Sequence, residues 1–379
     1  MARGPDGQGS GAGTSLSAQL FNARTVGDLG AELSVLPGFD AERFVAEAIR
    51  DLDGLGVFAR LDRIADAAEA QLPRDFPAMA DALEAALPPP LDPERTDDDF
   101  GRFIHALPGV LAVRHGLAHP DRALDLIHAA TQRFSMEYAV RPFLSRWPDL
   151  TLARMAVWAE DANYHVRRLV SEGTRPRLPW GANVTIDPLA PLPLLTGLHA
   201  DPTRYVTRSV ANHLNDLTRI APDAVYRALG TWHAEARQEP RELEWMTRHA
   251  LRTAVKRGEP EALRLLGYDP DAALSVMVYA PEIVRIGATL DLSVMVEADK
   301  AARVMVDYRV TFHRPGGRAG EKVFKLGQGH VAPGKPLRLA KSHRLKPDAT
   351  TFTWHPGPHR LVVQVNGRDR AEMAFEVEG

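Results

Sequence analysis

The sequence predicts a mainly α-helical chain, with a helical-repeat region followed by a C-terminal β-sandwich. Between about residues 100 and 268, apolar residues recur at helical spacing and the sequence matches itself with a 40-residue period. From about residue 275, apolar and polar residues alternate, as in half-buried strands. With 379 residues, the chain is long enough for two or three domains, and none of its apolar runs is long enough to cross a bilayer.

The N-terminal part predicts a short leader and then helices. Residues 1–15 are rich in glycine and lack the apolar core of a signal peptide, so they predict a disordered leader. Residues 16–86 carry apolar side chains at helical spacing, whereas the proline-rich and then acidic residues 87–99 predict a loop. We therefore expect one helical domain over residues 16–270. With no cysteine and no export signal, we expect a cytoplasmic, nucleoid-associated protein without disulfides.

The repeat positions predict stacked helix pairs. The recurring residues are His165, Val166, Arg168 and Val170, then Tyr205, Val206, Arg208 and Val210, then Trp245, Met246, Arg248 and Ala250. A period near 40 is typical of HEAT-like repeats, which stack into a curved solenoid with a concave face. The repeated arginines would form a ladder on one face. They either contact phosphates or pair with neighbouring acids such as Asp161 and Asp201.

The C-terminal part predicts an immunoglobulin-like β-sandwich over residues 275–379. Alternating apolar residues mark several strands, and turns at Pro315-Gly316-Gly317, Pro333-Gly334 and Pro356-Gly357-Pro358 separate them. About seven short strands in about 105 residues are typical of this sandwich.

Charge is unevenly distributed along the chain. Residues 1–140 carry 12 Lys/Arg against 22 Asp/Glu, a balance of −10, whereas residues 300–346 carry 12 against 2, a balance of +10. A basic segment of this kind favours a polyanionic partner, because each neutralised phosphate releases counterions. A solvated charged surface is the alternative.

Motifs for common chemistries are absent. The chain has no glycine-rich phosphate loop, no G-x-S-x-G elbow and no H-E-x-x-H pair, and without cysteine or a spaced His/carboxylate cluster we expect no metal and no cofactor. What remains is carboxylates beside arginines. In residues 165–180, Gly173 is expected to end a helix and to place Glu172 in its last turn, where the helix dipole disfavours a carboxylate. Other groups must therefore hold Glu172.

Two further segments lie about one repeat before and after it. Residues 209–216 place Asn212 and Asp216 on one helix face, and residues 135–143 contain Glu137. Apolar residues in these stretches are expected to belong to the core: Val140, Phe143, Val166, Leu169, Val210 and Leu214.

These three segments, with residues 248–267 and the KVFKL, HPGPH and VNG stretches, resemble the AlkC-type bacterial 3-methyladenine DNA glycosylases of the AlkC/AlkD HEAT-like repeat superfamily, in the branch with a C-terminal immunoglobulin-like domain. The resemblance covers roughly residues 100–375, and the SEGTRPRLPW block is its most specific part. It implies catalytic roles for Glu172, Asp216, Glu137 and Trp180. It further implies that the β-sandwich is an extra DNA contact and that the DNA is bent against the concave face, with the lesion reached in place.

The chemistry of that reaction suits these residue types. A base alkylated at N3 (adenine, with cytosine as a second candidate) is cationic and leaves as a neutral molecule, so positive charge develops on the deoxyribose. Fixed carboxylates stabilise such an oxocarbenium-like sugar, and Trp180 could offer a π-face to the cation.

We therefore expect a cofactor-free, monomeric glycosylase of base excision repair that acts on double-stranded DNA with alkylated bases and does not bind membranes. A non-catalytic DNA-binding repeat protein and a protein-interaction scaffold are the alternatives. The expected DNA contacts are Arg141, Arg167, Arg168, Arg175, Arg177, Arg208, Asn212, Asn215, Arg248, Lys322, Lys325 and Lys341.

Overall fold

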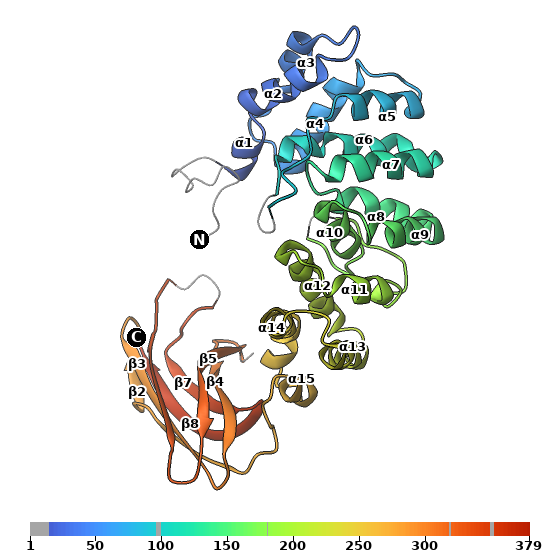
Figure 1. The fold of residues 1–379 in the computed structure, drawn as a ribbon. Helices are drawn as coiled ribbons and strands as arrows, with labels where there is room; N and C mark the ends of the chain where they lie inside the picture. The colour runs from blue at the N-terminus through green and yellow to red at the C-terminus, as the bar shows by residue number, and fades with distance from the viewer. Residues whose placement is uncertain (1–14, 96–99, 180, 318–319, 349–351) are drawn as a thin grey trace. The chain divides into compact units, whose positions relative to one another are not determined.

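The computed structural model describes residues 15–95, 100–179, 181–317, 320–348 and 352–379, and it shows helices followed by strands (Figure 1). This order confirms the predicted fold class. By internal contacts the chain forms two compact units, a helical unit (residues 1–221 and 231–250) and a β unit (residues 222–230 and 251–379). The domain boundary between residues 270 and 275 stays a prediction, since in the β unit Leu263 and Tyr268 already pack with Met305.

The helices of the described residues are short, and most begin at a capping residue or a proline. They are α1 (Leu16–Leu20), α2 (Ala23–Leu33), α3 (Ala41–Ala48), α4 (Val57–Glu69), α5 (Phe76–Ala85), the 3₁₀ turn η1 (Phe103–Ala106), α6 (Leu107–His115), the 3₁₀ turn η2 (Gly116–Ala118), α7 (Pro120–Thr131), α8 (Glu137–Arg146), α9 (Pro148–Trp158), α10 (Tyr164–Gly173), α11 (Leu192–Leu198), α12 (Arg204–Leu217), α13 (Pro222–Glu235), α14 (Pro240–Lys256) and α15 (Pro260–Leu265).

The recurring aspartates form the same side-chain turn in successive repeats. Oδ1 of Asp161 accepts the backbone N–H of Asn163 at 2.7 Å, just before α10. Oδ1 of Asp201 accepts the backbone N–H of Thr203 at 2.8 Å, just before α12. Such side-chain turns compete with helix and stop the chain from continuing the preceding element. They explain why α10 and α12 begin 40 residues apart, at Tyr164 and Arg204.

Helices α8, α10 and α12 are the elements that position the candidate site. Helix α10 packs against α8 on one side and against α12 on the other. The residues expected in the core are all fully buried in these helices: Val140, Phe143, Val166, Leu169, Val210 and Leu214. Burial of one apolar stripe per helix fixes the rotation of each helix, and so determines which of its polar residues face the neighbouring helices.

In the described part of the β unit, the strands form two sheets, with order β1-β3-β6 in one and β2-β8-β7-β4-β5 in the other. The strands are β1 (Leu274–Tyr279), β2 (Ile283–Arg285), β3 (Thr289–Ala298), β4 (Ala302–Phe312), β5 (Gly320–Val331), β6 (Leu337–Arg344), β7 (Gly357–Val365) and β8 (Arg368–Glu378). The sequence pattern did not reveal β2, because its three residues, which pair in parallel with β8, are too few to show alternation.

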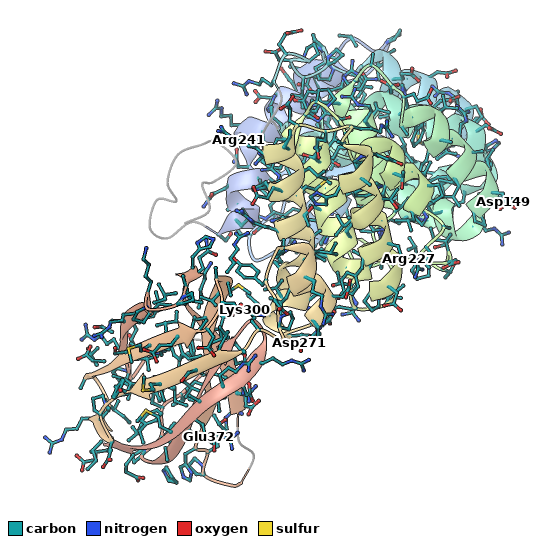
Figure 2. All side chains as sticks on the ribbon, turned by 60° about the horizontal axis from the view of Figure 1, so that its bottom comes forward. Asp149, Arg227, Arg241, Asp271, Lys300 and Glu372 are labelled. Carbon is teal, nitrogen blue, oxygen red and sulfur yellow. The ribbon has the colours of Figure 1, made fainter. Side chains whose placement is uncertain are left out.

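The alternating apolar residues of β3, β4 and β7 form the sandwich core. Each is at most 2% exposed: Leu290, Leu292, Val294, Val296, Val304, Val306, Tyr308, Val310, Phe312, Leu361, Val363 and Val365. Charged side chains lie on the outside of each unit, and the six that Figure 2 labels are all exposed. In the described residues, no helix is both long and apolar enough to cross a membrane.

Candidate active site

Three carboxylates from three packed helices lie along one row of ion pairs. Glu137 begins α8, Glu172 lies in the last turn of α10, and Asp216 lies near the end of α12. Arg168 connects the first two, since its Nη1 is 2.9 Å from Oε2 of Glu137 and its Nη2 is 3.7 Å from Oε2 of Glu172. Arg175 connects the last two. We call these five residues the acid row.

Arg175 is bound by two acids at once. Its Nη1 donates to Oε1 of Glu172 at 2.6 Å, and its Nε donates to Oδ2 of Asp216 at 2.9 Å. The contact with Asp216 joins residues 41 positions apart. Glu172, Asp216 and Glu137 therefore do not point to separate surfaces. They are spaced and oriented by two shared guanidinium groups.

Glu172 is the most deeply buried acid of the row, with 5% of its surface exposed. Burial alone raises the pKa of a carboxyl, but the positive charges of Arg168 and Arg175 outweigh burial and, with a hydrogen bond from Ser209, lower the pKa of Glu172 below its ordinary value. Oγ of Ser209 donates to Oε2 of Glu172 at 2.6 Å. Glu172 is thus a fixed, ionised carboxylate at neutral pH, although it occupies the unfavourable end of its helix.

Asp216 and Glu137 are more open than Glu172. The side chain of Asp216 is 15% exposed and that of Glu137 is 19% exposed. Among the described residues, the hydrogen bonds to Asp216 use Oδ2 and those to Glu137 use Oε2. Oδ1 of Asp216 and Oε1 of Glu137 accept no hydrogen bond from the described residues, so both keep their lone pairs for a water molecule or a ligand.

An aromatic ring lies beside the acid row. The guanidinium of Arg168 lies 4.6 Å from the ring centre of Tyr205, a repeat position of α12. Burial raises the pKa of Tyr205, so its hydroxyl stays neutral. The exposed ring of Phe100 meets Tyr205 edge to face at 5.5 Å.

Two predicted DNA contacts need correction because their side chains are buried. Arg141 is fully buried, and Asn215 is 6% exposed. Neither side chain is open to a phosphate in this structure. Arg141 is an internal residue of α8, and its guanidinium binds backbone carbonyls.

The other predicted contacts in the helical unit differ in accessibility. Arg167 binds Asp201 through Nε at 2.6 Å and is mostly buried, so here the acid-pairing alternative describes the observed contacts. In the arginine ladder, Arg168 is engaged by acids, Arg208 is half-buried, and Arg248 is exposed and pairs with Glu244. The remaining two positions are Arg177, which is exposed, and Asn212, whose Oδ1 lies 2.8 Å from Nε2 of His249.

The lysines predicted to bind DNA lie on adjacent parts of the β unit. Lys322 and Lys325 belong to β5, and Lys341 belongs to β6. Lys341 and Lys325 are exposed, and Nζ of Lys341 donates to the carbonyl of Lys325 at 2.6 Å. The ammonium of Lys322 lies 4.5 Å from the ring centre of Phe352. The role of these lysines in DNA binding stays a prediction.

Trp180 lies outside the described residues, so its predicted role stays a prediction.

The sequence analysis missed Ser209 and Ser135 as site residues. Ser135 Oγ donates to Glu137 and accepts from Arg168 at 2.7 Å. Both serines begin segments in which the acids were noticed. A serine inside a helix at a buried position, as at 209, was the available signal, because serine there needs a polar partner.

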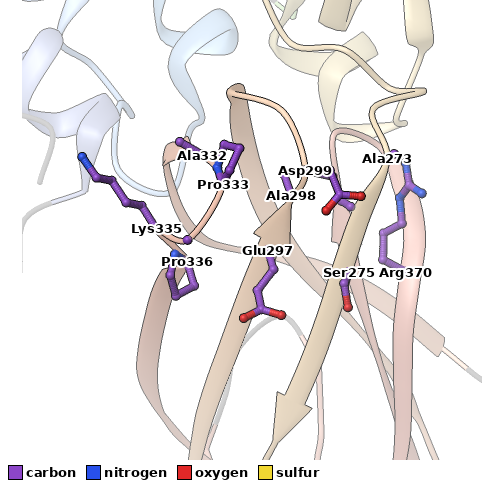
Figure 3. Close-up of a pocket in the computed structure, with 12 residues that line it drawn as sticks. Ala273, Ser275, Glu297, Ala298, Asp299, Ala332, Pro333, Lys335, Pro336 and Arg370 are labelled. Carbon is purple, nitrogen blue, oxygen red and sulfur yellow. The ribbon is translucent and has the colours of Figure 1, made fainter.

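The described residues contain no group of three or more His, Asp or Glu side chains arranged to hold a metal ion. A hollow of about 580 Å³ in the β unit is lined by residues such as Glu297, Asp299, Lys335 and Arg370 (Figure 3). Its carboxylates are exposed, and it contains none of the candidate residues. The acid row is therefore the candidate site.

The fold and the site define a class of protein, in which packed helices carry a row of paired acids and an immunoglobulin-like domain follows. A family model described as the C-terminal Ig-like domain of the uncharacterised protein YhaZ matches residues 273–379. The uncharacterised protein YhaZ of Bacillus subtilis (strain 168) is 29% identical over 370 residues, which are 95% of this chain and 98% of that protein.

A solved structure is similar along nearly the whole chain. The Pseudomonas fluorescens alkylpurine DNA glycosylase AlkC, bound to DNA containing an abasic site analog, is 31% identical, with a TM-score of 0.81 over 97% of this chain and 100% of that one. The chain belongs to the AlkC family, in the form with a C-terminal Ig-like domain.

Proposed function

We propose that this protein is a DNA glycosylase of base excision repair that hydrolyses the N-glycosidic bond of cationic alkylated bases, N3-methyladenine first and N3-methylcytosine second. The observation that carries the proposal is the acid row, in which Glu172 lies between two guanidinium groups that also hold Glu137 and Asp216. The similarity to an alkylpurine DNA glycosylase over the full chain supports it.

The charge of the row suits the reaction. Its three carboxylates and two guanidinium groups have a formal sum of −1. A cationic base leaves as a neutral molecule, so the transition state has its positive charge on the sugar and needs little help from a general acid. Carboxylates held in place by arginines stabilise that charge without reorganising, which is the most effective form of electrostatic catalysis.

The three acids have different proposed roles, because their side chains differ in exposure. Glu172, buried and ionised, supplies fixed negative charge. Asp216 has an open Oδ1 and is the acid best placed to accept a hydrogen bond from the attacking water, and Glu137 has an open Oε1 at the other end of the row. The proposed roles thus follow from which carboxylate oxygens the arginines leave open.

The proposed substrate is double-stranded DNA. In the helical unit, Arg177, Arg208 and Arg248 retain exposed or half-exposed cations for phosphates, and in the β unit Lys325 and Lys341 do so. Each such contact would release counterions and make binding salt-dependent. We further propose that the protein works as a monomer in the cytoplasm, at the nucleoid.

The test is incubation of the purified protein with methylated duplex DNA and mass-spectrometric identification of the released bases. We expect release of N3-methyladenine by the wild type. Glu172→Gln should lower the single-turnover rate by about 10²–10³-fold, the size typical for loss of one electrostatic partner. Arg43→Gln, which alters an exposed ion pair with Glu47 away from the expected DNA contacts, is the matched control and should retain the rate. Release of no alkylated base by the wild type would refute the proposal.

The deep burial of Glu172 favours one second candidate, a non-catalytic DNA-binding protein. In that case Glu172 would serve only to neutralise Arg168 and Arg175. Such a protein would bind methylated and unmethylated duplexes without releasing a base, so the same experiment distinguishes the two functions.

A further inference from the structure

Arg141 has an unusual environment for a guanidinium group. It is fully buried, where a charge is costly unless it is hydrogen-bonded. Its Nη1 donates to the carbonyls of Gly173 at 3.0 Å and Arg175 at 2.8 Å, and its Nε donates to the carbonyl of Ala182. A single side chain from α8 therefore binds the carbonyl of the last residue of α10 and two carbonyls of the segment that follows it.

The backbone is shaped to admit this guanidinium. A Cβ atom on Gly173 would lie 2.6 Å from Cγ1 of Val140, and a Cβ atom on Gly181 would lie 2.6 Å from Cδ of Arg141. Real Cβ atoms essentially never come so close to another heavy atom. Glycine at both positions thus lets the segment close over α8.

His213 holds the same segment from α12. Its Nδ1 lies 3.0 Å from the carbonyl oxygen of Ser171, the residue before Glu172. Because a carbonyl can only accept, Nδ1 carries the proton. Burial lowers the pKa of His213 to about 4, so the ring is neutral at neutral pH and donates from Nδ1 alone.

Three of the four carbonyls belong to Arg175 itself or to the residues next to Glu172. Ser171 and Gly173 lie on either side of Glu172, and Arg175 carries its own bound carbonyl. Neither Arg141 nor His213 donates to a carboxylate of the row in the described residues, so their hydrogen bonds act on the row through the backbone. The positive charge of Arg141 also acts on the acids through space, and Arg141→Lys keeps that charge. We propose that Arg141 and His213 are positioning residues, which hold the backbone on both sides of Glu172 so that Glu172 and Arg175 keep the geometry that the reaction requires.

We name this pair the carbonyl clamp. The expected effect of the clamp on the rate of base release rests on the proposed glycosylase activity. The expected effect of the clamp on the order of the backbone does not. A shift of about 1 Å in a catalytic group can cost about 10²-fold in rate. Loss of the clamp should therefore lower the rate of base release far more than the affinity for DNA.

The helical unit contains matched controls for both residues. Arg60 is also a buried arginine, and it donates to the carbonyls of Phe21 at 2.8 Å and Leu55 at 3.1 Å. His199 is also a fully buried histidine, and its Nδ1 lies 2.7 Å from the carbonyl oxygen of Thr196. Neither contacts the acid row in the described residues.

The experiment compares Arg141→Lys with Arg60→Lys, and His213→Leu with His199→Leu, at a temperature well below each melting midpoint. We expect the single-turnover rate to fall by about 10²-fold for Arg141→Lys and for His213→Leu, with Kd for undamaged duplex within about threefold of the wild type. The control variants should lose comparable thermal stability and retain the rate within about twofold. Equal rate losses in the clamp and control variants would overturn the proposal. If Arg141→Lys does not fold, the comparison of His213→Leu with His199→Leu provides the test.

Hydrogen–deuterium exchange provides a readout that does not depend on activity. Amides in peptides covering residues 171–182 should exchange at least tenfold faster in the clamp variants and at the wild-type rate in the control variants. Unchanged protection of this segment in both clamp variants would refute the clamp. Should the wild type release no base, the proposed function fails, while the exchange data still support or refute the clamp.

Discussion

Nε of Arg175 donates to Oδ2 of Asp216 at 2.9 Å, although the two residues are 41 positions apart in the chain. The same guanidinium binds Glu172 through Nη1 at 2.6 Å. One cation therefore sets the distance between acids of two different helices. This explains how a short segment after α10 can organise a site that spans the repeats.

Removal of this cation should destabilise the protein strongly. In Arg175→Gln, the buried Glu172 would keep only Arg168, at 3.7 Å, as a charged partner. Breaking a buried ion pair on one side costs about 3–5 kcal/mol in the free energy of unfolding, because a charge stays behind without its partner. Urea unfolding measures this loss.

A double-mutant cycle supplies the control for that loss. Glu172→Gln combined with Arg175→Gln removes both charges, so its destabilisation should be less than the sum of the single variants by at least about 1 kcal/mol. Arg248→Gln at the exposed Glu244 pair should cost less than about 1 kcal/mol. Strict additivity in the cycle would show that Glu172 and Arg175 do not stabilise each other.

Asp216→Asn should separate catalysis from folding. The amide keeps the shape of the side chain and an acceptor for Arg175, but it removes the negative charge at one end of the row. We expect the single-turnover rate of base release to fall by about 10²–10³-fold, while the melting temperature and the affinity for undamaged duplex change little. A variant that releases N3-methyladenine at the wild-type rate would exclude Asp216 from the chemistry.

The stability of the protein should depend on pH through His213. Its folded-state pKa of about 4 lies below the ordinary value of 6.5, so between these values the unfolded chain binds a proton that the folded chain excludes. Stability therefore falls as pH falls from 6.5 toward 4, by about 2 kcal/mol between pH 7 and pH 5 from this group.

The His213→Leu variant isolates that contribution. Glu172 has a lowered pKa, so the stability it provides is lost only as pH falls below 4.5, outside this window. Other buried histidines shift in the same direction and are common to both proteins. The difference in unfolding free energy between wild type and His213→Leu should thus shrink by about 2 kcal/mol from pH 7 to pH 5. A constant difference would mean that His213 is not held neutral.

Much of the architecture was predictable because it depends on local periodicity. The 40-residue repeat correctly related α10 to α12, and the alternation of Leu290 to Val296 correctly placed β3. The position of Glu172 in a last helical turn followed from Gly173 in the sequence, and the structure ends α10 there. The need for groups that hold this carboxylate was also predicted, and Arg168, Arg175 and Ser209 meet it.

The partners of individual polar side chains were not predictable, because they depend on the rotation of neighbouring helices. Arg141 and Arg175 each lie a few residues after a candidate acid in the sequence, yet one binds carbonyls inside the fold and the other binds two acids. Composition does not distinguish an arginine that binds a phosphate from one whose guanidinium donates hydrogen bonds to buried backbone carbonyls. The same limit applies to His213, which in sequence is one polar residue among others in its segment.

Lysines of the β unit should contribute to the salt dependence of DNA binding. Lys325 and Lys341 are exposed on β5 and β6, which are consecutive in the chain, within a segment whose balance over residues 300–346 is +10. Each phosphate contact adds about −0.9 to the slope of log K against log salt concentration for duplex DNA. The Lys325→Gln/Lys341→Gln variant should therefore bind undamaged duplex more weakly at low salt, with a slope less negative by about 1–2. Arg285→Gln, which alters a pair with Glu378 on the same unit, is the control and should leave the slope unchanged. Fluorescence anisotropy at several salt concentrations measures both, and equal slopes for all three proteins would place the phosphate contacts elsewhere.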